Sequence, residues 1–163
     1  MSLTTAYLSV GSNLGDRKRA IDNALKLLCR SSQVCFIQSA PLYETKPEGG
    51  PPQGPYLNTV WEIETSLEAR GLLDFLLSIE SELGRKRKEK NEPRLIDLDL
   101  LFFGDQVIQE PNLTVPHPRL HERWFVLKPL SDLRPGLIHP VLKKNICELL
   151  DRVNENCQSP RST

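Results

Sequence analysis

The sequence predicts an α+β fold, in which an antiparallel sheet has two helices packed on one face and further elements added at the C-terminal end. Two observations support this class. Four segments have the alternating or uniformly apolar pattern of strands, and two segments between them have apolar residues at helical spacing. Their order along the chain, βαββαβ, is that of the ferredoxin-like arrangement. Because this arrangement carries many unrelated functions, it leaves the function open.

The first half of the predicted core runs from a strand into a helix and back to a strand. Residues 5–10 (TAYLSV) predict the first strand, and the turn GSNLGD leads into a helix over residues 17–28 with Asp16 as its N-cap. The second strand begins at residues 34–37 and either ends there or continues past Pro41. The stretch KPEGGPPQGP contains four prolines and three glycines, which predicts an irregular loop.

The second half completes the sheet and adds a C-terminal region. Residues 56–65 predict the third strand, residues 67–83 a helix closed by Gly84, and RKRKEKNEP a charged loop. The run PRLIDLDLLFFG then predicts a buried strand that ends at the turn after Gly104. Beyond it we expect a short hairpin, a turn at VPHPRL, a short helix near 121–131, a helix near 144–153 and a disordered end, QSPRST.

Length and composition predict one domain over residues 1–157, with 158–163 as a disordered tail. The 21 basic residues balance the 21 acidic ones, so no global charge favours binding to nucleic acid or to a membrane. No stretch resembles a signal peptide or a membrane helix, and the four cysteines have no metal-ligand spacing. We therefore expect a cytoplasmic monomer with free thiols.

Two aspartates interrupt the most apolar strand of the sequence. Because side chains alternate along a strand, Asp97 and Asp99 point to the same face, with Cα atoms roughly 6.5–7 Å apart. Two bare carboxylates at that distance repel each other by about 2.4 kcal/mol at an effective dielectric constant near 20. Either this face is simply exposed to solvent, or the pair binds divalent metal whose other ligands are nucleotide phosphates.

Basic residues flank the aspartate pair on both sides in the sequence. Guanidinium groups bind phosphate well, although a basic run can also be a solvated loop. The chain has no GxxxxGK[ST] phosphate-binding loop, so any ATP would be bound in another way. The candidates are Arg85, Arg87 and Arg94 upstream, and His117, Arg119, His121 and Arg123 downstream.

Three further side chains could bind a flat heteroaromatic ligand. Asn58 offers amide hydrogen bonds, while Tyr56 and Phe125 offer ring stacking. The alternative for both aromatic residues is a place in the hydrophobic core.

Five separated motifs occur in one order along residues 5–150. They are G-S-N-L-G-D; Y-E-T followed by a proline-rich loop and Y-L-N; G-R-x-R; P-R-x-x-D-L-D-L-L; and V-P-H-P-R-L-x-x-R-x-F. Together they resemble the 6-hydroxymethyl-7,8-dihydropterin pyrophosphokinase family. The resemblance implies transfer of diphosphate from ATP to the hydroxymethyl group of the dihydropterin, with release of AMP, in folate biosynthesis.

The resemblance also implies a role for each matching residue. Asp97 and Asp99 would bind two Mg²⁺ ions that bridge the ATP phosphates, and with Arg85 and Arg94 they would form the catalytic set. The ATP-binding residues would be Glu80, Arg87, Leu100, His117 and Arg123. The pterin would stack between Tyr56 and Phe125, and its other contacts would come from Gly11, Asn13, Thr45 and Asn58.

The chain departs from the family pattern in the segment between Arg85 and Arg94. This segment is one residue shorter than in well-known members, lacks a tryptophan found in some of them, and carries Glu92 before Pro93. These changes bear on whether the loop closes normally over ATP. Trp124, beside Phe125, is either a substitute aromatic lid or a core residue.

Two other function classes compete with the enzyme. A nucleic-acid-binding module on the same fold would use the basic loop, but the strands lack the paired aromatic residues of RNA-recognition domains. A domain that senses a small molecule would bind the same ligands without turnover. Magnesium-dependent formation of AMP separates this sensing domain from the enzyme.

Overall fold

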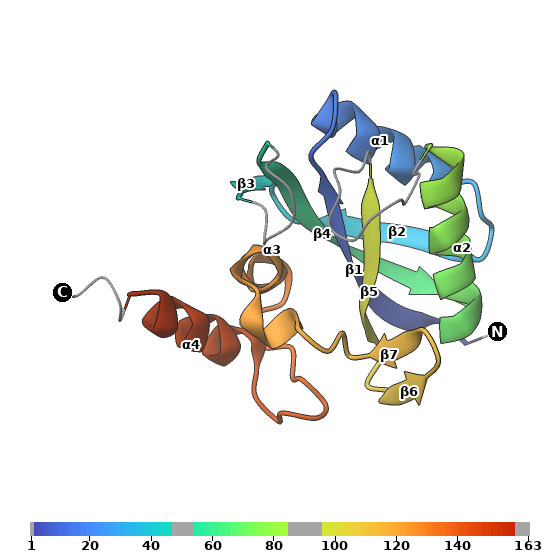
Figure 1. Ribbon diagram of the computed structural model, residues 1–163. Coiled ribbons are helices and arrows are strands. Elements are labelled where there is room, and N and C mark those ends of the chain that lie inside the picture. Colours follow the sequence, from blue (N-terminus) through green and yellow to red (C-terminus); the bar gives the residue numbers. More distant parts are fainter. Residues whose placement is uncertain (1, 47–53, 85–95, 159–163) are drawn as a thin grey trace.

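The protein forms a five-stranded antiparallel sheet in the computed structural model, which describes residues 2–46, 54–84 and 96–158 (Figure 1). The sheet order is β2-β4-β1-β5. The short strand β3 pairs with the first three residues of β4, beside the part of β4 that pairs with β2. The strands are β1 (Thr4–Ser12), β2 (Val34–Ser39), β3 (Tyr43–Thr45), β4 (Tyr56–Thr65) and β5 (Asp97–Phe103). This order puts β1 at the centre, between β4 and β5.

Two helices cover one face of the sheet. Helices α1 (Arg17–Leu28) and α2 (Ala69–Glu82) lie side by side on that face (Figure 1). Their apolar stripes pack against alternate residues of the strands, as the periodicity predicts. The cluster includes Leu8, Leu28, Ile63, Leu72, Leu76 and Leu98.

The C-terminal elements are a hairpin of β6 (Ile108–Glu110) and β7 (Leu113–Val115), a 3₁₀ turn (Leu120–Glu122), α3 (Trp124–Leu133) and α4 (Ile146–Gln158). Of these, the 3₁₀ turn, α3 and α4 pack on the opposite face, whereas the β6–β7 hairpin contributes Leu113 and Val115 to the core on the α1 and α2 side. Residues of the 3₁₀ turn, α3 and α4 form a second core with Tyr7, Val60 and Phe102 of the sheet. The predicted single helical face is therefore correct for α1 and α2, and the added elements give the sheet a second covered face.

Most predicted elements are found, with differences at their ends. Helix α1 has the predicted bounds, and Gly84 ends the α2 region with a φ of +88°, which favours glycine. The extension of the second strand past Pro41 is wrong: β2 ends at Ser39, and the chain enters a separate β3. The helix near 121–131 is instead a 3₁₀ turn followed by α3, because Arg123 between them has an extended backbone.

The end of the chain also differs from the prediction. Helix α4 begins two residues later than expected and extends to Gln158, the first residue of the predicted disordered end; residues 159–163 lie outside the described part. Cys29, Cys35 and Cys147 are free thiols, as expected. No helix in the described residues is both long and apolar enough to cross a membrane.

An ion pair ties the end of α3 to the sheet. Arg134, which follows α3, donates to both carboxylate oxygens of Glu62 on β4, at 3.2 and 3.0 Å. Gln38 of β2 donates to the same carboxylate at 2.8 Å, and the Glu62 side chain is only 5% exposed. Because the buried carboxylate has several donors, its burial is compensated, and the position of α3 over the sheet is held.

Candidate active site

The predicted site residues meet at one end of the central strands. Gly11, near the end of β1, pairs with Asn58 of β4 on one side and with Asp97 of β5 on the other. Directly paired residues of an antiparallel sheet share a face, and neighbouring strands lie about 4.8 Å apart. The pterin-side residue Asn58 and the metal-side residue Asp97 are therefore two strands apart, at about 10 Å. They share the face that carries α3.

Gly11 is required by the close approach of Asn58. A Cβ atom on Gly11 would lie 2.8 Å from Asn58 Oδ1 and 3.7 Å from Tyr56 Cδ1. The Asn58 side chain is buried, and its Nδ2 donates a hydrogen bond to Thr45 Oγ1. These contacts orient the amide and place three predicted pterin residues around Gly11.

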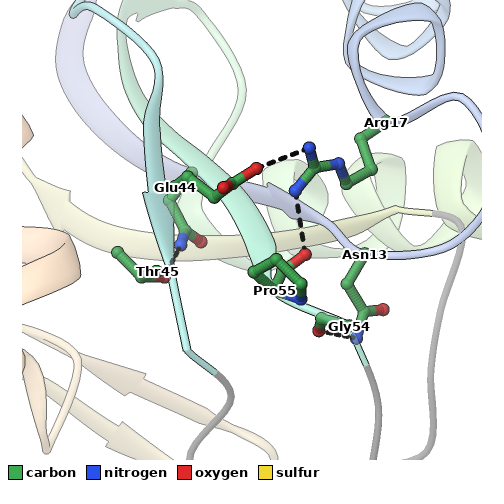
Figure 2. A network of polar contacts seen from close by, with 7 residues as sticks. Asn13, Arg17, Glu44, Thr45, Gly54 and Pro55 are labelled. Carbon is green, nitrogen blue, oxygen red and sulfur yellow. Dashed lines mark hydrogen bonds and ion pairs between the residues drawn. The ribbon is translucent and has the colours of Figure 1, made fainter.

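The loop that follows β1 lies against the start of β4. Asn13 Nδ2 is 3.5 Å from the carbonyl oxygen of Gly54, and Figure 2 shows the two residues side by side. Arg17, at the start of α1, contacts the same region through Glu44 and Pro55. The predicted pterin residue Asn13 therefore belongs to the same end of the sheet as Thr45 and Asn58.

The aspartate pair lies on the same face as Gly11. Asp97 and Asp99 are both partly exposed, and Leu98 between them points into the opposite core. Glu80 of α2 is buried and accepts a hydrogen bond from the Leu98 N–H at 2.7 Å. This contact fixes the backbone between the two aspartates; a contact between Glu80 and ATP stays a prediction.

Strict alternation ends just beyond the pair. The pairing of β1 with β5 shifts between Tyr7 and Leu8, and Leu101 and Phe102 both belong to the second core. Leu100 faces the core on the α1 and α2 side and is buried. Its predicted contact with ATP is not tested by this position.

His117 follows β7 and lies close to the aspartates. Its N–H donates to the Leu101 carbonyl at 3.0 Å, and its Nδ1 accepts from the Arg119 N–H at 3.2 Å. Burial and the charges of Arg123 and Arg119 lower the pKa of His117 to about 4, although Asp97 acts in the opposite direction. At neutral pH the ring is therefore neutral, with its proton on Nε2 as a donor.

This lowered pKa predicts weaker folding in acid. An unfolded histidine has a pKa near 6.5, so between pH 6.5 and 4 the unfolded chain binds a proton that the folded chain excludes. We expect the free energy of unfolding to fall by up to about 3 kcal/mol through this window because of His117. Urea unfolding at pH 7, 5.5 and 4.5 measures the loss.

The control for this prediction is His117→Gln, which should flatten the pH dependence. It should not abolish it, because burial and His121 also lower the pKa of His139. Equal pH slopes in the wild type and the variant would contradict the assignment to His117.

Arg123 and Phe125 complete the site from the start of α3. The Arg123 guanidinium lies 5.5 Å from the centre of the Phe125 ring, a cation–π distance. The charge of Arg123 also lowers the pKa of His117, so Arg123, Phe125 and His117 lie around one region. The sandwich of pterin between Tyr56 and Phe125 stays a prediction, as do the roles of Arg85, Arg87 and Arg94, which lie outside the described residues.

Trp124 contacts β3. Its ring meets Tyr43 edge to face, with centres 5.7 Å apart, and the Tyr43 hydroxyl donates to Asp132 of α3. The pKa of Tyr43 is raised to about 12. The hydrogen bond to Asp132 is the main cause, and slight burial and the negative charge of Asp132 add to it. Trp124 thus packs α3 against β3, the strand that carries Thr45. This role is closer to that of a core residue than to that of an aromatic lid.

The aspartate pair has the donor chemistry that Mg²⁺ prefers. Magnesium binds through one or two carboxylates together with water and substrate phosphates. Among the residues that the structure describes, no group of three or more His, Cys, Asp or Glu side chains is arranged to hold a metal ion. The pair supplies the two carboxylates to which Mg²⁺ can bind when water and phosphate oxygens complete its shell.

Sequence reasoning missed two residues that shape the site, Arg17 and Tyr43. Tyr43 carried no signal beyond its place in the Y-E-T motif. Arg17 carried a weak one: α1 begins with Arg-Lys-Arg and has no acidic residue in its first turn. Positive charge at a helix N-terminus opposes the helix dipole, typically by 0.3–1 kcal/mol per group. Such a violation of a local rule often marks a residue with a tertiary role.

Comparisons with known proteins place most of the chain within one family. Residues 7–135 match the family of 7,8-dihydro-6-hydroxymethylpterin-pyrophosphokinase (HPPK). The 2-amino-4-hydroxy-6-hydroxymethyldihydropteridine pyrophosphokinase of Bacillus subtilis is 43% identical over 128 residues, which cover 78% of this chain and 77% of that protein. The folic acid synthesis protein fol1 of Schizosaccharomyces pombe is 42% identical over 148 residues, 91% of this chain.

The chain is much shorter than several of its relatives. It spans 20% of the Schizosaccharomyces pombe protein and 46% of the HPPK-DHPS chain of Plasmodium falciparum. That crystal structure has the same fold, with a TM-score of 0.78, 16% identity and coverage of 98% of this chain. Since the family match extends over most of the chain, the chain belongs to the 7,8-dihydro-6-hydroxymethylpterin-pyrophosphokinase family.

Proposed function

We propose that the chain transfers diphosphate from ATP to the hydroxymethyl group of 6-hydroxymethyl-7,8-dihydropterin, giving AMP and the pterin diphosphate, in folate biosynthesis. Family membership supports the reaction. The observation that carries the proposal is the row of paired residues in which Gly11 separates Asn58 from Asp97. This row offers a heterocycle-binding amide and a carboxylate pair about 10 Å apart on one face.

The reaction needs positioning more than acid–base chemistry. The hydroxymethyl oxygen forms a bond to the β-phosphorus of ATP while the bond from that phosphorus to the α,β-bridging oxygen breaks, so AMP leaves and the hydroxyl proton goes to solvent. The oxygen and the phosphorus must be held in line, in a site whose charges match those that develop. We assign no protein nucleophile.

The chain's own residues divide this work. Asn58, oriented by Thr45, reads the hydrogen-bonding edge of the pterin, and Tyr56 and Phe125 stack on its faces. His117 donates from Nε2, and Arg123 adds positive charge on the phosphate side. Asp97 and Asp99 would hold Mg²⁺, for which we propose two ions, and the bound metal would neutralise phosphate charge.

Four further features, the fold type, the domain bounds, the location and the oligomeric state, complete the proposal. We assign the sheet order, with α1 after β1 and α2 after β4, to the ferredoxin-like arrangement. We treat residues 1–157 as one domain. We also place the protein in the cytoplasm, as a monomer, with its free thiols supporting a reducing compartment.

The direct test is formation of AMP from ATP and Mg²⁺ with and without 6-hydroxymethyl-7,8-dihydropterin. The proposal predicts AMP and pterin diphosphate in equal amounts, only when both substrates and Mg²⁺ are present. Pterin binding without AMP would favour the sensing domain and contradict the enzyme.

Aromatic stacking gives a second measurable result. Tyr56→Ala and Phe125→Ala should each weaken pterin binding by roughly 1–3 kcal/mol, because each removes one face of the proposed sandwich. Calorimetric titration with pterin measures the loss, and titration with MgATP serves as the internal control. If both variants bind pterin as the wild type does, the two aromatic residues have only a packing role.

A further inference from the structure

One guanidinium group joins two chain segments at the pterin end of the sheet. Arg17 Nη2 contacts Glu44 Oε2 of β3 at 2.6 Å, and its Nη1 donates to the Pro55 carbonyl oxygen at 3.0 Å. Figure 2 shows Arg17 reaching from the start of α1 to both residues, with Asn13 and Gly54 beside them. The two segments are thus held by a residue of a third element.

Both contacts lie one residue from a predicted pterin contact. Glu44 precedes Thr45, whose hydroxyl accepts from Asn58, and Pro55 precedes Tyr56. Thr45 and Tyr56 are themselves paired between β3 and β4. A shift of Glu44 or Pro55 would therefore move the side chains that orient Asn58 and cover Gly11.

The arrangement suits positioning better than stability. The Arg17 side chain is 29% exposed and that of Glu44 is 56% exposed, and ion pairs with this exposure add little to folding. The planar guanidinium instead offers two separate donors in fixed directions. A lysine could contact Glu44 or Pro55, but its single nitrogen is less suited to reaching both. Arg17 is also the first residue of α1, where its positive charge interacts unfavourably with the helix dipole. Stability of the helix therefore does not explain an arginine at this position.

We propose that Arg17 is a positioning residue for pterin recognition: it holds the paired residues Thr45 and Tyr56 in place by binding the residue that precedes each. The inference rests on the proposed function, because it concerns the pterin side of the same site. Arg17 touches neither substrate in this proposal, and ATP binding does not depend on it.

The test compares steady-state kinetics of Arg17→Ala, Arg17→Lys and the control Lys18→Ala. Lys18 is the next residue of α1 and pairs with Asp22 on the helix surface, at 3.2 Å. Arg17→Ala should raise the KM for the pterin about five- to tenfold and leave kcat and the KM for ATP within about twofold. Arg17→Lys should lie between Arg17→Ala and the wild type, and Lys18→Ala should match the wild type.

Hydrogen exchange gives a readout that does not depend on activity. The backbone N–H groups of residues 56–58 should exchange faster in Arg17→Ala than in Lys18→Ala, because the start of β4 is released. Unchanged exchange together with an unchanged KM for the pterin would overturn the inference while leaving the proposed function intact. An equal loss for both substrates with a lowered Tm would also overturn it, since that pattern indicates general destabilisation.

The two proposals can fail separately. If the wild type forms no pterin-dependent AMP, the proposed function fails, and hydrogen exchange alone then decides whether Arg17 holds the two segments. If the wild type is active and only the Arg17 variants lose pterin affinity, both proposals stand.

Discussion

Replacing Asp97 or Asp99 by alanine should reduce diphosphate transfer at saturating Mg²⁺ by at least about a hundredfold, or about 2.7 kcal/mol in the activation barrier. Each carboxylate lies on the face shared with Gly11, and no third carboxylate, histidine or cysteine among the described residues is arranged to replace it. The loss should fall on the chemical step, which single-turnover quench-flow measures directly. Neither variant should unfold, because both side chains are partly exposed.

The control for this prediction is Asp105→Ala, in the turn after β5. Asp105 is exposed and lies beyond the opposite end of the strand from the aspartate pair, so its loss should leave the rate unchanged. Retention of more than about a tenth of the wild-type rate by Asp97→Ala or Asp99→Ala, a cost below about 1.4 kcal/mol, would contradict the metal assignment.

Replacing Gly11 by alanine should damage the pterin side of the site. The added Cβ would lie 2.8 Å from Asn58 Oδ1, closer than such atoms approach, so the buried amide must leave the position in which its Nδ2 donates to Thr45. We expect pterin affinity to fall by about 2 kcal/mol, roughly thirtyfold, through the lost hydrogen bonds of Asn58. Affinity for MgATP should change far less, and calorimetry of both ligands measures the difference.

Two further variants separate this steric effect from a general one. Gly136→Ala is the matched control, because nothing lies within 4 Å of the Cβ position there. In Gly11→Ala with Asn58→Ala the clash disappears, so the free energy of unfolding should exceed the value expected from adding the two single losses. Pterin affinity should stay low. Strictly additive losses would show that Gly11 and Asn58 do not interact as the distance indicates.

Local patterns in the sequence were enough to locate most of the elements. The bounds of α1, the strand at residues 56–65 and the turn at Gly84 follow from an N-cap, apolar spacing and a glycine at the end of a helical pattern. The shared face of Asp97 and Asp99 follows from strand alternation alone. The motifs likewise indicated which residue types the site would contain, because their order and spacing are readable without a structure.

Tertiary structure decided which of these residues meet. Gly11 stands between Asn58 and Asp97 only because β1 pairs with both β4 and β5, and no local pattern specifies sheet neighbours. The break after Ser39, the bulge at Leu101 and the packing of α3 on the second face also depend on long-range contacts. Arg17 and Glu80 show the same limit, since their partners Pro55 and Leu98 are backbone groups remote in sequence. A side chain's identity states what it can donate or accept, whereas only the folded chain determines which group lies within hydrogen-bond distance.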